Sequence, residues 1–281
     1  MKEKTFDTEL GGIHYWTNRY EEGRPSLVML PGLTATHILF DKQVEYFKDK
    51  ANVLVWDAPA HGASRPFRLQ FSMDDMARYL HEILASEGVA NPILVGQSMG
   101  GYVAQAYMDL FPGYLAGFVS IDSCSLKRRY VTAFDIWALK RVGAIYRLYP
   151  WNALKKAGAN GCAETDYGRN LMREMVGSYS HDEYVALASF GYRILADALD
   201  TDRKYDIDSP TILICGEKDK AGSAKRYNTQ WAKGENLPVR WIKGAGHNSN
   251  TDKPEEVNRI IEEFVSGIYT ATNPKKDDKL D

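Results

Sequence analysis

The chain has 281 residues, enough for one large α/β domain with an insertion or for two modest domains. Its 35 basic and 37 acidic residues are closely interspersed and give a formal net charge of -2. This balance argues against a nucleic-acid groove or a membrane-attracting surface, so we predict no nucleic-acid partner and no stable membrane insertion. We interpret the strongest basic cluster, Lys127-Arg128-Arg129, as a solvated loop.

The first residues of the chain and its cysteines indicate in which cellular compartment we expect the protein. Residues 1–10 alternate charged and polar side chains and lack the apolar stretch of a signal peptide. No segment approaches the roughly twenty apolar residues that a membrane-spanning helix needs. Cys124, Cys162 and Cys215 are an odd number for a disulfide framework and are not spaced as metal ligands. We therefore expect a soluble cytoplasmic protein with reduced thiols.

Short β-rich segments alternate with helical patterns, which is typical of a mostly parallel sheet covered on both faces. Several of these segments are continuous apolar runs, as expected of strands buried on both faces. The fold class is therefore predicted to be α/β, with strands at residues 13–16, 27–30, 53–57, 93–95, 115–122, 211–215 and 239–242.

Two helices have clear boundary signals. Ser72 is a suitable N-cap, with Asp74 and Asp75 in the first turn and an apolar face behind them. The last helix begins at Pro254, where a proline costs no hydrogen bond. The polar tail, residues 272–281, is expected to be disordered.

Residues 125–206 break the alternation of strands and helices. They contain helical patterns at 133–148, 167–176 and 181–199, many large apolar side chains and no convincing strand. A helical insertion between two strands of the sheet fits this pattern best. We therefore predict a core formed by residues 1–124 and 207–271, with a helical insertion at 125–206.

The central motif is Gly96-Gln97-Ser98-Met99-Gly100, between a predicted buried strand and a predicted helix. A serine at such a sharp turn adopts a strained backbone conformation, and its hydroxyl projects above the sheet. The helix N-terminus then offers backbone N–H groups to developing negative charge. Ser98 is the candidate nucleophile, and a glycine-rich turn with an incidental serine is the alternative.

A serine hydroxyl needs a base, and His247 is the candidate. It follows the last predicted strand in a glycine-rich loop, at the sheet edge where open α/β sheets bind ligands. Asp219 lies in the loop where an acid that orients this histidine is expected, and the chain order Ser98, Asp219, His247 fits. Glu217, in the same loop, and Asp122, at the end of the preceding strand, remain rivals for the acid.

Acyl transfer also needs donors for an oxyanion. The loop Leu30-Pro31-Gly32-Leu33-Thr34 follows a predicted strand and should lie beside the serine turn. We assign the N–H groups of Leu33 and Met99 as the donors, and this assignment depends on the fold. The chemistry needs no metal and no organic cofactor, and none is predicted.

Together, in this order and at these intervals, the motifs resemble the α/β-hydrolase superfamily from about residue 12 to residue 269. The matching pieces are the Pro31-Gly32 loop, residues 57–65, the 96–101 turn, and the loops that end at Asp219 and His247. The resemblance implies an α/β-hydrolase fold and a serine hydrolase similar to esterases and lipases. The insertion would correspond to the family's helical lid, which covers the active site and shapes the acyl pocket.

The chain departs from the family pattern in two loops. The type of nucleophile also limits which branches of the superfamily the chain can resemble. Many members carry His-Gly where this chain has Pro31-Gly32, so the hydrogen bonding of that loop can differ. Residues 59–62 read Pro-Ala-His-Gly where Pro-Gly-x-Gly is commoner, with no obvious catalytic consequence. A serine nucleophile, rather than an aspartate, argues against the haloalkane dehalogenase and epoxide hydrolase branches.

The resemblance implies cleavage of a carboxylic ester of a small or medium apolar substrate through an acyl-enzyme. A thioesterase, lactonase, amidase or carbon–carbon bond hydrolase with the same triad is an alternative. A second alternative is a small-molecule sensor with slow turnover that signals by binding a partner protein. We expect a monomer or a homodimer that binds a small ester-like molecule.

Overall fold

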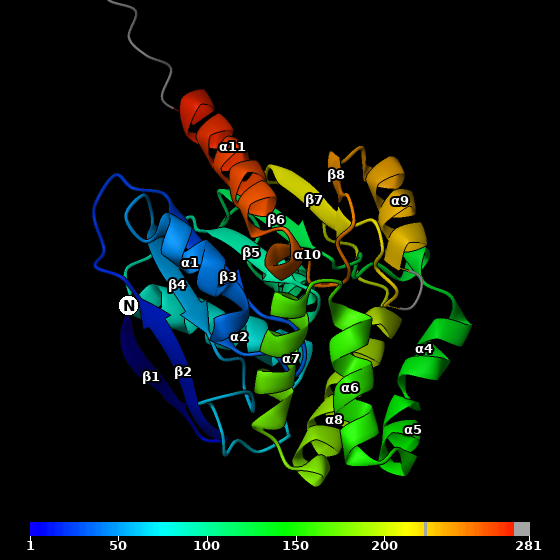
Figure 1. The fold of residues 1–281 in the computed structure, drawn as a ribbon. Helices are drawn as coiled ribbons and strands as arrows, with labels where there is room; N and C mark the ends of the chain where they lie inside the picture. The colour runs from blue at the N-terminus through cyan, green and yellow to red at the C-terminus, as the bar shows by residue number, and fades with distance from the viewer. Residues whose placement is uncertain (222–223, 273–281) are drawn as a thin grey trace, which may run out of the picture.

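The computed structural model describes residues 1–221 and 224–272. The chain forms an eight-stranded sheet in the order β1-β2-β4-β3-β5-β6-β7-β8, flanked by helices (Figure 1). The pairs β1–β2 and β2–β4 are antiparallel, and the other pairs are parallel. The predicted fold class is confirmed. The strands are β1 (Lys2–Thr8), β2 (Gly11–Thr17), β3 (Ser26–Leu30), β4 (Asn52–Trp56), β5 (Ile93–Gln97), β6 (Gly117–Ile121), β7 (Thr211–Gly216) and β8 (Val239–Ile242).

The seven predicted strands are all present, each within two residues of its predicted ends. Every residue of β3, β4, β5, β6 and β7 is buried, which explains why these strands are continuous apolar runs. The sequence does not predict β1, because its alternating charged residues resemble a surface segment. In the structure β1 is a largely exposed edge strand, and lysines on such a strand protect it from pairing with other chains.

Helices flank the sheet in pairs: α1 packs beside α11, and α2 packs beside α3. Ser72 caps α2 as predicted, because its hydroxyl accepts the N–H of Asp75 at 3.1 Å while the Asp75 carboxylate accepts the N–H of Ser72 at 2.9 Å. The helices outside the insertion are η1 (His37–Phe40), α1 (Asp41–Phe47), α2 (Met73–Ser86), α3 (Met99–Leu110), α9 (Ala224–Glu235), α10 (Ser249–Asp252) and α11 (Pro254–Thr272).

The chain between β6 and β7 is helical, and the structure describes all of it. It contains η2 (Arg128–Tyr130), α4 (Ala133–Leu139), α5 (Val142–Leu148), α6 (Trp151–Cys162), α7 (Asp166–Gly177) and α8 (His181–Asp200). We refer to residues 125–206 as the helical insertion. In Figure 1 it extends from one edge of the sheet, in green to yellow-green.

One prediction within the helical insertion is wrong, and one helix of the insertion was not predicted. The single helix expected at 133–148 is divided into α4 and α5 at Lys140 and Arg141. At the start of α5, Gly143 packs tightly on Ser189 of α8, since a Cβ at Gly143 would lie 2.0 Å from the Ser189 Oγ. The sequence also does not predict α6, since Gly158 and Gly161 lower its intrinsic helix propensity.

The basic cluster at the start of the insertion is also not the solvated loop that we predicted. The Nζ of Lys127 lies 2.9 Å from a carboxylate oxygen of Glu235 on α9, and the Lys127 side chain is only 10% exposed. Arg129 pairs with the same carboxylate at 2.7 Å. The Glu235 carboxylate has little access to water, so the two cations stabilise its charge. These ion pairs join the helical insertion to α9.

The remaining predictions concern the tail, the thiols and the membrane. Residues 273–281 of the predicted tail lie outside the described residues, whereas Thr272 is the last residue of α11. Cys124, Cys162 and Cys215 are free. None of the helices within the described ranges is long and apolar enough to cross a membrane.

Candidate active site

Ser98 lies at the sharp turn between β5 and α3. Its backbone has φ 49° and ψ -116°, a conformation that costs on the order of 1–3 kcal/mol for a residue with a side chain. The surrounding sheet maintains this conformation, since the N–H of Ser98 donates to the carbonyl of Ile121 on the neighbouring strand β6 at 2.9 Å. The turn lifts the serine side chain above the sheet, where Ser98 lines a cavity.

The glycines of the motif are there because the turn is tightly packed. A Cβ at Gly100 would lie 1.9 Å from the carbonyl oxygen of Leu30, and a Cβ at Gly96 would lie 2.5 Å from the backbone nitrogen of Gly101. Neither position has space for any side chain. The turn after β5 therefore depends on glycine for close packing of backbone against backbone.

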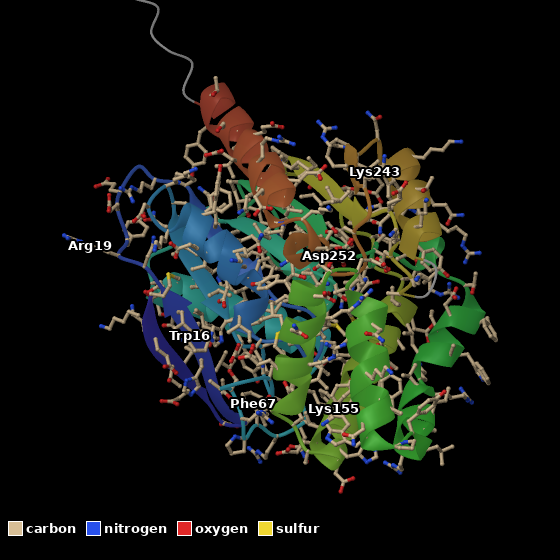
Figure 2. The ribbon with its side chains drawn as sticks, in the orientation of Figure 1. Trp16, Arg19, Phe67, Lys155, Lys243 and Asp252 are labelled. Atoms are coloured by element: carbon tan, nitrogen blue, oxygen red, sulfur yellow. The ribbon has the colours of Figure 1, made fainter. Side chains whose placement is uncertain are left out.

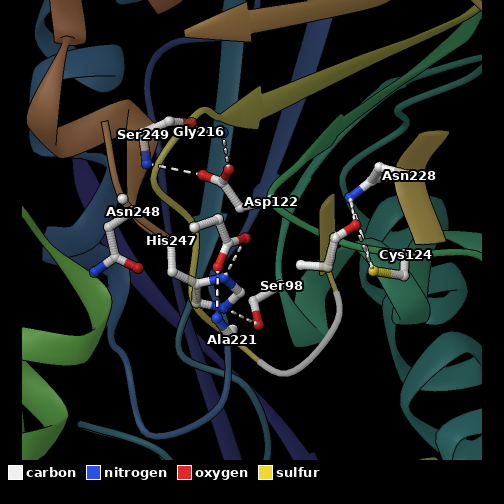
Figure 3. A network of polar contacts seen from close by, with 12 residues as sticks. Ser98, Asp122, Cys124, Gly216, Ala221, Asn228, His247, Asn248 and Ser249 are labelled. Carbon is white, nitrogen blue, oxygen red and sulfur yellow. Dashed lines mark hydrogen bonds and ion pairs between the residues drawn. The ribbon is translucent and has the colours of Figure 1, made fainter. Parts of the chain in front are cut away.

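Three side chains from separate loops form one hydrogen-bonded line (Figure 3). The Nε2 of His247 lies 2.9 Å from the Oγ of Ser98, and its Nδ1 lies 3.0 Å from the Oδ2 of Asp219. The Asp219 side chain is 2% exposed and that of His247 is 14% exposed. The other oxygen of Asp219 accepts the N–H of Ala221 at 2.8 Å, which fixes the carboxylate toward the histidine.

The two rival acids have other partners. Asp122 is buried, and its two carboxylate oxygens accept the N–H groups of Gly216 at 2.6 Å and Ser249 at 2.8 Å (Figure 3). Glu217 is exposed and accepts the N–H of Gly244 at 3.3 Å. Of the three acids considered from the sequence, only Asp219 has a hydrogen bond to His247 in the described structure.

The electrostatic environment favours a protonated histidine. Burial alone would lower the pKa of His247, but the charge and hydrogen bond of Asp219, with the charge of Asp122, outweigh it and raise this pKa above its usual value. Burial, and next the negative charge of Asp219, raise the pKa of the Asp122 carboxyl well above its usual range. His247 can thus accept a proton readily and hold it as an imidazolium.

The predicted oxyanion loop lies against the serine turn. A Cβ at Gly32 would lie 3.0 Å from the Cβ of Ser98, so the chain just before Leu33 passes directly beside the nucleophile. Leu33 and Met99 line the same cavity as Ser98 and His247, and Met99 is the first residue of α3. This placement is what donors to a developing oxyanion require.

The cavity above Ser98 has a volume of about 490 Å³, within the range typical of small-molecule sites. Its lining comes from the sheet loops on one side and from the helical insertion on the other. The insertion contributes aliphatic side chains and a group of tyrosines, and Tyr102 of α3 adds another. The tyrosines are Tyr102, Tyr146, Tyr149, Tyr184 and Tyr192. Most of the lining is apolar, so the cavity suits an apolar group beside the reacting atom.

Two residues that sequence reasoning missed hold the loop of His247. Gln97 donates from its Nε2 to the carbonyl of His247 at 2.9 Å. The buried carboxylate of Asp252 (Figure 2) accepts the N–H of Gly246 at 2.8 Å, and it also accepts the N–H groups of Glu164 and Thr165 in the insertion. Gln97 belongs to the motif, but nothing in the sequence indicates its partner, and Asp252 has no sequence signal.

No group of three or more His, Cys, Asp or Glu side chains within residues 1–221 and 224–272 is arranged to hold a metal ion. Ser98 shares the cavity with the imidazole of His247 and with the side-chain amides of Gln97 and Asn248.

The mostly parallel sheet and the serine turn at its edge define an α/β-hydrolase. The sequence profile of the Alpha/beta hydrolase family matches residues 27–260, and the chain belongs to this family. It is 24% identical over 263 residues to the uncharacterized hydrolase YugF of Bacillus subtilis, covering 90% of this chain and 95% of that protein. It is 20% identical over 265 residues to the monoacylglycerol lipase ABHD6 of Bos taurus, covering 90% of this chain and 79% of that protein.

Solved structures give the same fold. A thermophilic esterase from Thermogutta terrifontis superposes with a TM-score of 0.73 at 21% sequence identity, covering 95% of this chain and 99% of the esterase. The chain is therefore a hydrolase of the α/β family with esterase-like and lipase-like relatives.

Proposed function

We propose that the protein is a serine hydrolase that cleaves carboxylic esters of small or medium apolar substrates through an acyl-enzyme. The observation that carries the proposal is the line from Ser98 Oγ to His247 Nε2 at 2.9 Å and from His247 Nδ1 to Asp219 Oδ2 at 3.0 Å. Ser98 is the nucleophile, His247 the general base and Asp219 the acid that orients it. Ser98 and His247 line an apolar cavity, where an ester carbonyl can reach Ser98.

The reaction proceeds in two halves. The Nε2 of His247 accepts the proton of Ser98 while the Oγ attacks the ester carbonyl carbon. The N–H groups of Leu33 and Met99 stabilise the resulting oxyanion, and losing one such donor typically costs about 2.7–4 kcal/mol. His247 then protonates the leaving alcohol, and an acyl group remains on Ser98. A water molecule, deprotonated by the same histidine, attacks the acyl group and releases the acid.

The cavity and the relatives support the proposed substrate class. The aliphatic and tyrosine lining supports an apolar acyl or alcohol group, with the helical insertion as the lid that shapes its pocket. A monoacylglycerol lipase and an esterase among the similar proteins support an ester as the bond that is cleaved. We also propose a reducing compartment such as the cytoplasm, where three free thiols persist.

The test is hydrolysis of p-nitrophenyl esters, from acetate to long acyl chains, by the wild type and by Ser98→Ala. We expect turnover that disappears in Ser98→Ala, with an optimum at a short or medium acyl chain. The matched control is Ser123→Ala, since Ser123 is buried beside Gly101 and its hydroxyl has no hydrogen-bond partner in the described structure. This control should keep its activity.

The outcomes separate the alternatives. Activity that survives in Ser98→Ala would contradict the assigned nucleophile. A stoichiometric burst followed by very slow release would favour the sensor alternative over the esterase. An inactive wild type whose Ser98 still reacts with a fluorophosphonate would exclude simple esters and favour another bond of the same chemistry.

A further inference from the structure

The helical insertion carries an unusual concentration of exposed apolar side chains. Ten large hydrophobic side chains are exposed in the described part of the chain, and five of them lie between residues 134 and 149. They are Phe134, Trp137, Ile145, Leu148 and Tyr149, and Leu148 is the most exposed at 84%. Scattered exposed apolar residues need no explanation, but a concentration of them marks an interaction site.

The exposed residues share helix faces. Phe134 and Trp137 are three residues apart on α4, and their rings stack with centroids 5.6 Å apart. Ile145 and Leu148 have the same spacing on α5, and Tyr149 follows directly. We call Phe134, Trp137, Ile145, Leu148 and Tyr149 the apolar patch. Figure 1 shows α4 and α5 at the side of the insertion away from α7.

Positive charge accompanies the apolar patch. Residues 133–156 contain five Lys or Arg and one acidic residue, for a net charge of +4, whereas the whole chain has -2. The one acid, Asp135, is occupied because its carboxylate accepts the N–H of Thr132, the N-cap of α4. Lys140 pairs with Asp197 and Asp200 of α8 at 3.1 and 3.7 Å. The exposed cations Arg141, Arg147 and Lys156 have no ion pair among the described residues. Arg141 lies over the Trp137 ring, 4.2 Å from its centroid.

The apolar patch continues into the cavity of the proposed active site. Ile145 and Tyr149 are 54% and 49% exposed, and both also line the cavity that contains Ser98. An apolar chain in contact with the outer surface could thus reach the cavity along side chains of α5 and its C-terminal flank. The next helix along the chain, α6, adds another cation beside an aromatic ring. Its Lys155, labelled in Figure 2, has its Nζ 5.2 Å from the centroid of the Trp151 ring.

We propose that the apolar patch and its cations dock the protein on an anionic lipid surface. Aromatic and aliphatic side chains enter the boundary between headgroups and acyl chains, while arginines and lysines bind the phosphate groups. Charge complementarity favours this occupant over a second copy, because two copies of the same patch would bring together the exposed cations Arg141, Arg147 and Lys156 of each copy. The charge balance of the whole chain argues against such a surface, but the excess of positive charge is local to residues 133–156 of the helical insertion.

The test is co-sedimentation with vesicles of phosphatidylglycerol and phosphatidylcholine, compared with vesicles of phosphatidylcholine alone. Ser98→Ala serves as the background, so lipid hydrolysis cannot change the vesicles and the result does not depend on the proposed function. We expect binding to the anionic vesicles that weakens at high salt, and little binding to the neutral ones.

Two variants probe the two components of the surface. Trp137→Ser with Leu148→Ser removes exposed apolar contacts, and Arg141→Gln with Arg147→Gln and Lys156→Gln removes charge. Each should reduce partitioning to anionic vesicles by roughly tenfold or more. The control is Tyr20→Ser with Tyr114→Ser, which removes two exposed aromatic side chains elsewhere and should bind like the background. Circular dichroism checks that all variants are folded.

Three results would overturn the proposal. The first is no binding to anionic vesicles by a folded background protein. The second is equal binding by the background and by both patch variants. The third is a concentration-dependent dimer that Trp137→Ser with Leu148→Ser abolishes, without any vesicle binding, which would assign the patch to a second copy.

Discussion

The Nε2 of Gln97 donates a hydrogen bond to the backbone carbonyl of His247 at 2.9 Å, so the residue before the nucleophile holds the main chain of the base. The same nitrogen donates to the Oδ1 of Asn248 at 3.1 Å. On the other side of this buried amide, a Cβ at Gly32 would lie 2.4 Å from its Oε1. The Gln97 side chain thus lies between the loop of Gly32 and the loop of His247.

We expect Gln97→Leu to lower kcat by roughly 10- to 100-fold while KM changes little, because a small displacement of the base costs alignment rather than substrate contacts. The measurement is the steady-state kinetics of p-nitrophenyl ester hydrolysis. Ser72→Ala is the control, since it loses a remote helix cap worth about 1 kcal/mol of stability and should keep its kcat. An unchanged kcat in folded Gln97→Leu would show that Gln97 does not position His247.

The assignment of Asp219 as the acid can be separated from its rivals. Asp219→Asn should lower kcat by on the order of 10⁴, because an amide cannot stabilise the imidazolium and favours the wrong tautomer. Glu217→Gln is the matched control, since Glu217 is exposed in the same loop and contacts only the N–H of Gly244. Kinetics in which Glu217→Gln is the more damaging change would reverse the assignment.

The sequence predicts those features whose signal is local. The strands β3 to β7 are short apolar runs between turns, and the serine turn has glycines that packing requires, so both are recognised without a structure. The order of Ser98, Asp219 and His247 along the chain also anticipates their placement at one sheet edge. In the structure, the loops at this edge bring His247 within hydrogen-bond distance of both Ser98 and Asp219.

Features that depend on contacts distant in the sequence are not predicted. Lys127 was expected in solvent, but Glu235, 108 residues later, draws it into a buried pair. Asp252 looks like an ordinary acid near a helix, and only the fold brings it to the N–H groups of Glu164 and Thr165, 88 and 87 residues away. Partners at such separations leave no periodicity or motif in the sequence.

The buried Asp122 should make stability depend on pH in a definite direction. Its folded-state pKa is raised, chiefly by burial and then by Asp219, so the folded protein holds the proton above pH ~4, where the unfolded chain releases it. Stability from this group is present at low pH and is lost as pH rises through the folded-state pKa. The free energy of unfolding of Asp122→Asn, relative to that of the wild type, should therefore increase as pH rises, which means that the variant becomes relatively more stable.

The measurement is urea unfolding of wild type and Asp122→Asn at several values between pH 4 and neutrality. Asn at this position can still accept one of the two N–H groups, from Gly216 or Ser249, so the variant is expected to fold. A difference in the free energy of unfolding that is constant or falls with rising pH would contradict a raised pKa for Asp122.

Asp252 should link the helical insertion to the loop of His247. Asp252→Ala removes both acceptor oxygens, which receive the N–H groups of Glu164, Thr165 and Gly246, and we expect a loss of about 1.5–3 kcal/mol in the free energy of unfolding. Hydrogen exchange should accelerate at residues 163–168 and 244–248 together, because both segments lose the same acceptor. Acceleration in only one of the two segments would mean that Asp252 does not couple them.

The packing of the serine turn can be tested by adding one methyl group. At Gly100 this methyl would lie 1.9 Å from the carbonyl oxygen of Leu30, backbone that cannot move without disturbing β3, so Gly100→Ala should cost about 3 kcal/mol or more. Gly267→Ala is the matched control in α11, because nothing lies within 4 Å of its added Cβ and a helical glycine-to-alanine change should stabilise by about 0.5–1 kcal/mol.

Urea unfolding of the two variants measures both effects on one scale, with Ser98 modification by a fluorophosphonate as the second readout. Gly100→Ala should also lose this modification, since the turn must shift Ser98 to relieve the clash with Leu30. A Gly100→Ala protein as stable and as reactive as Gly267→Ala would mean that the turn has room for a side chain, and the strained conformation of Ser98 would then need another cause.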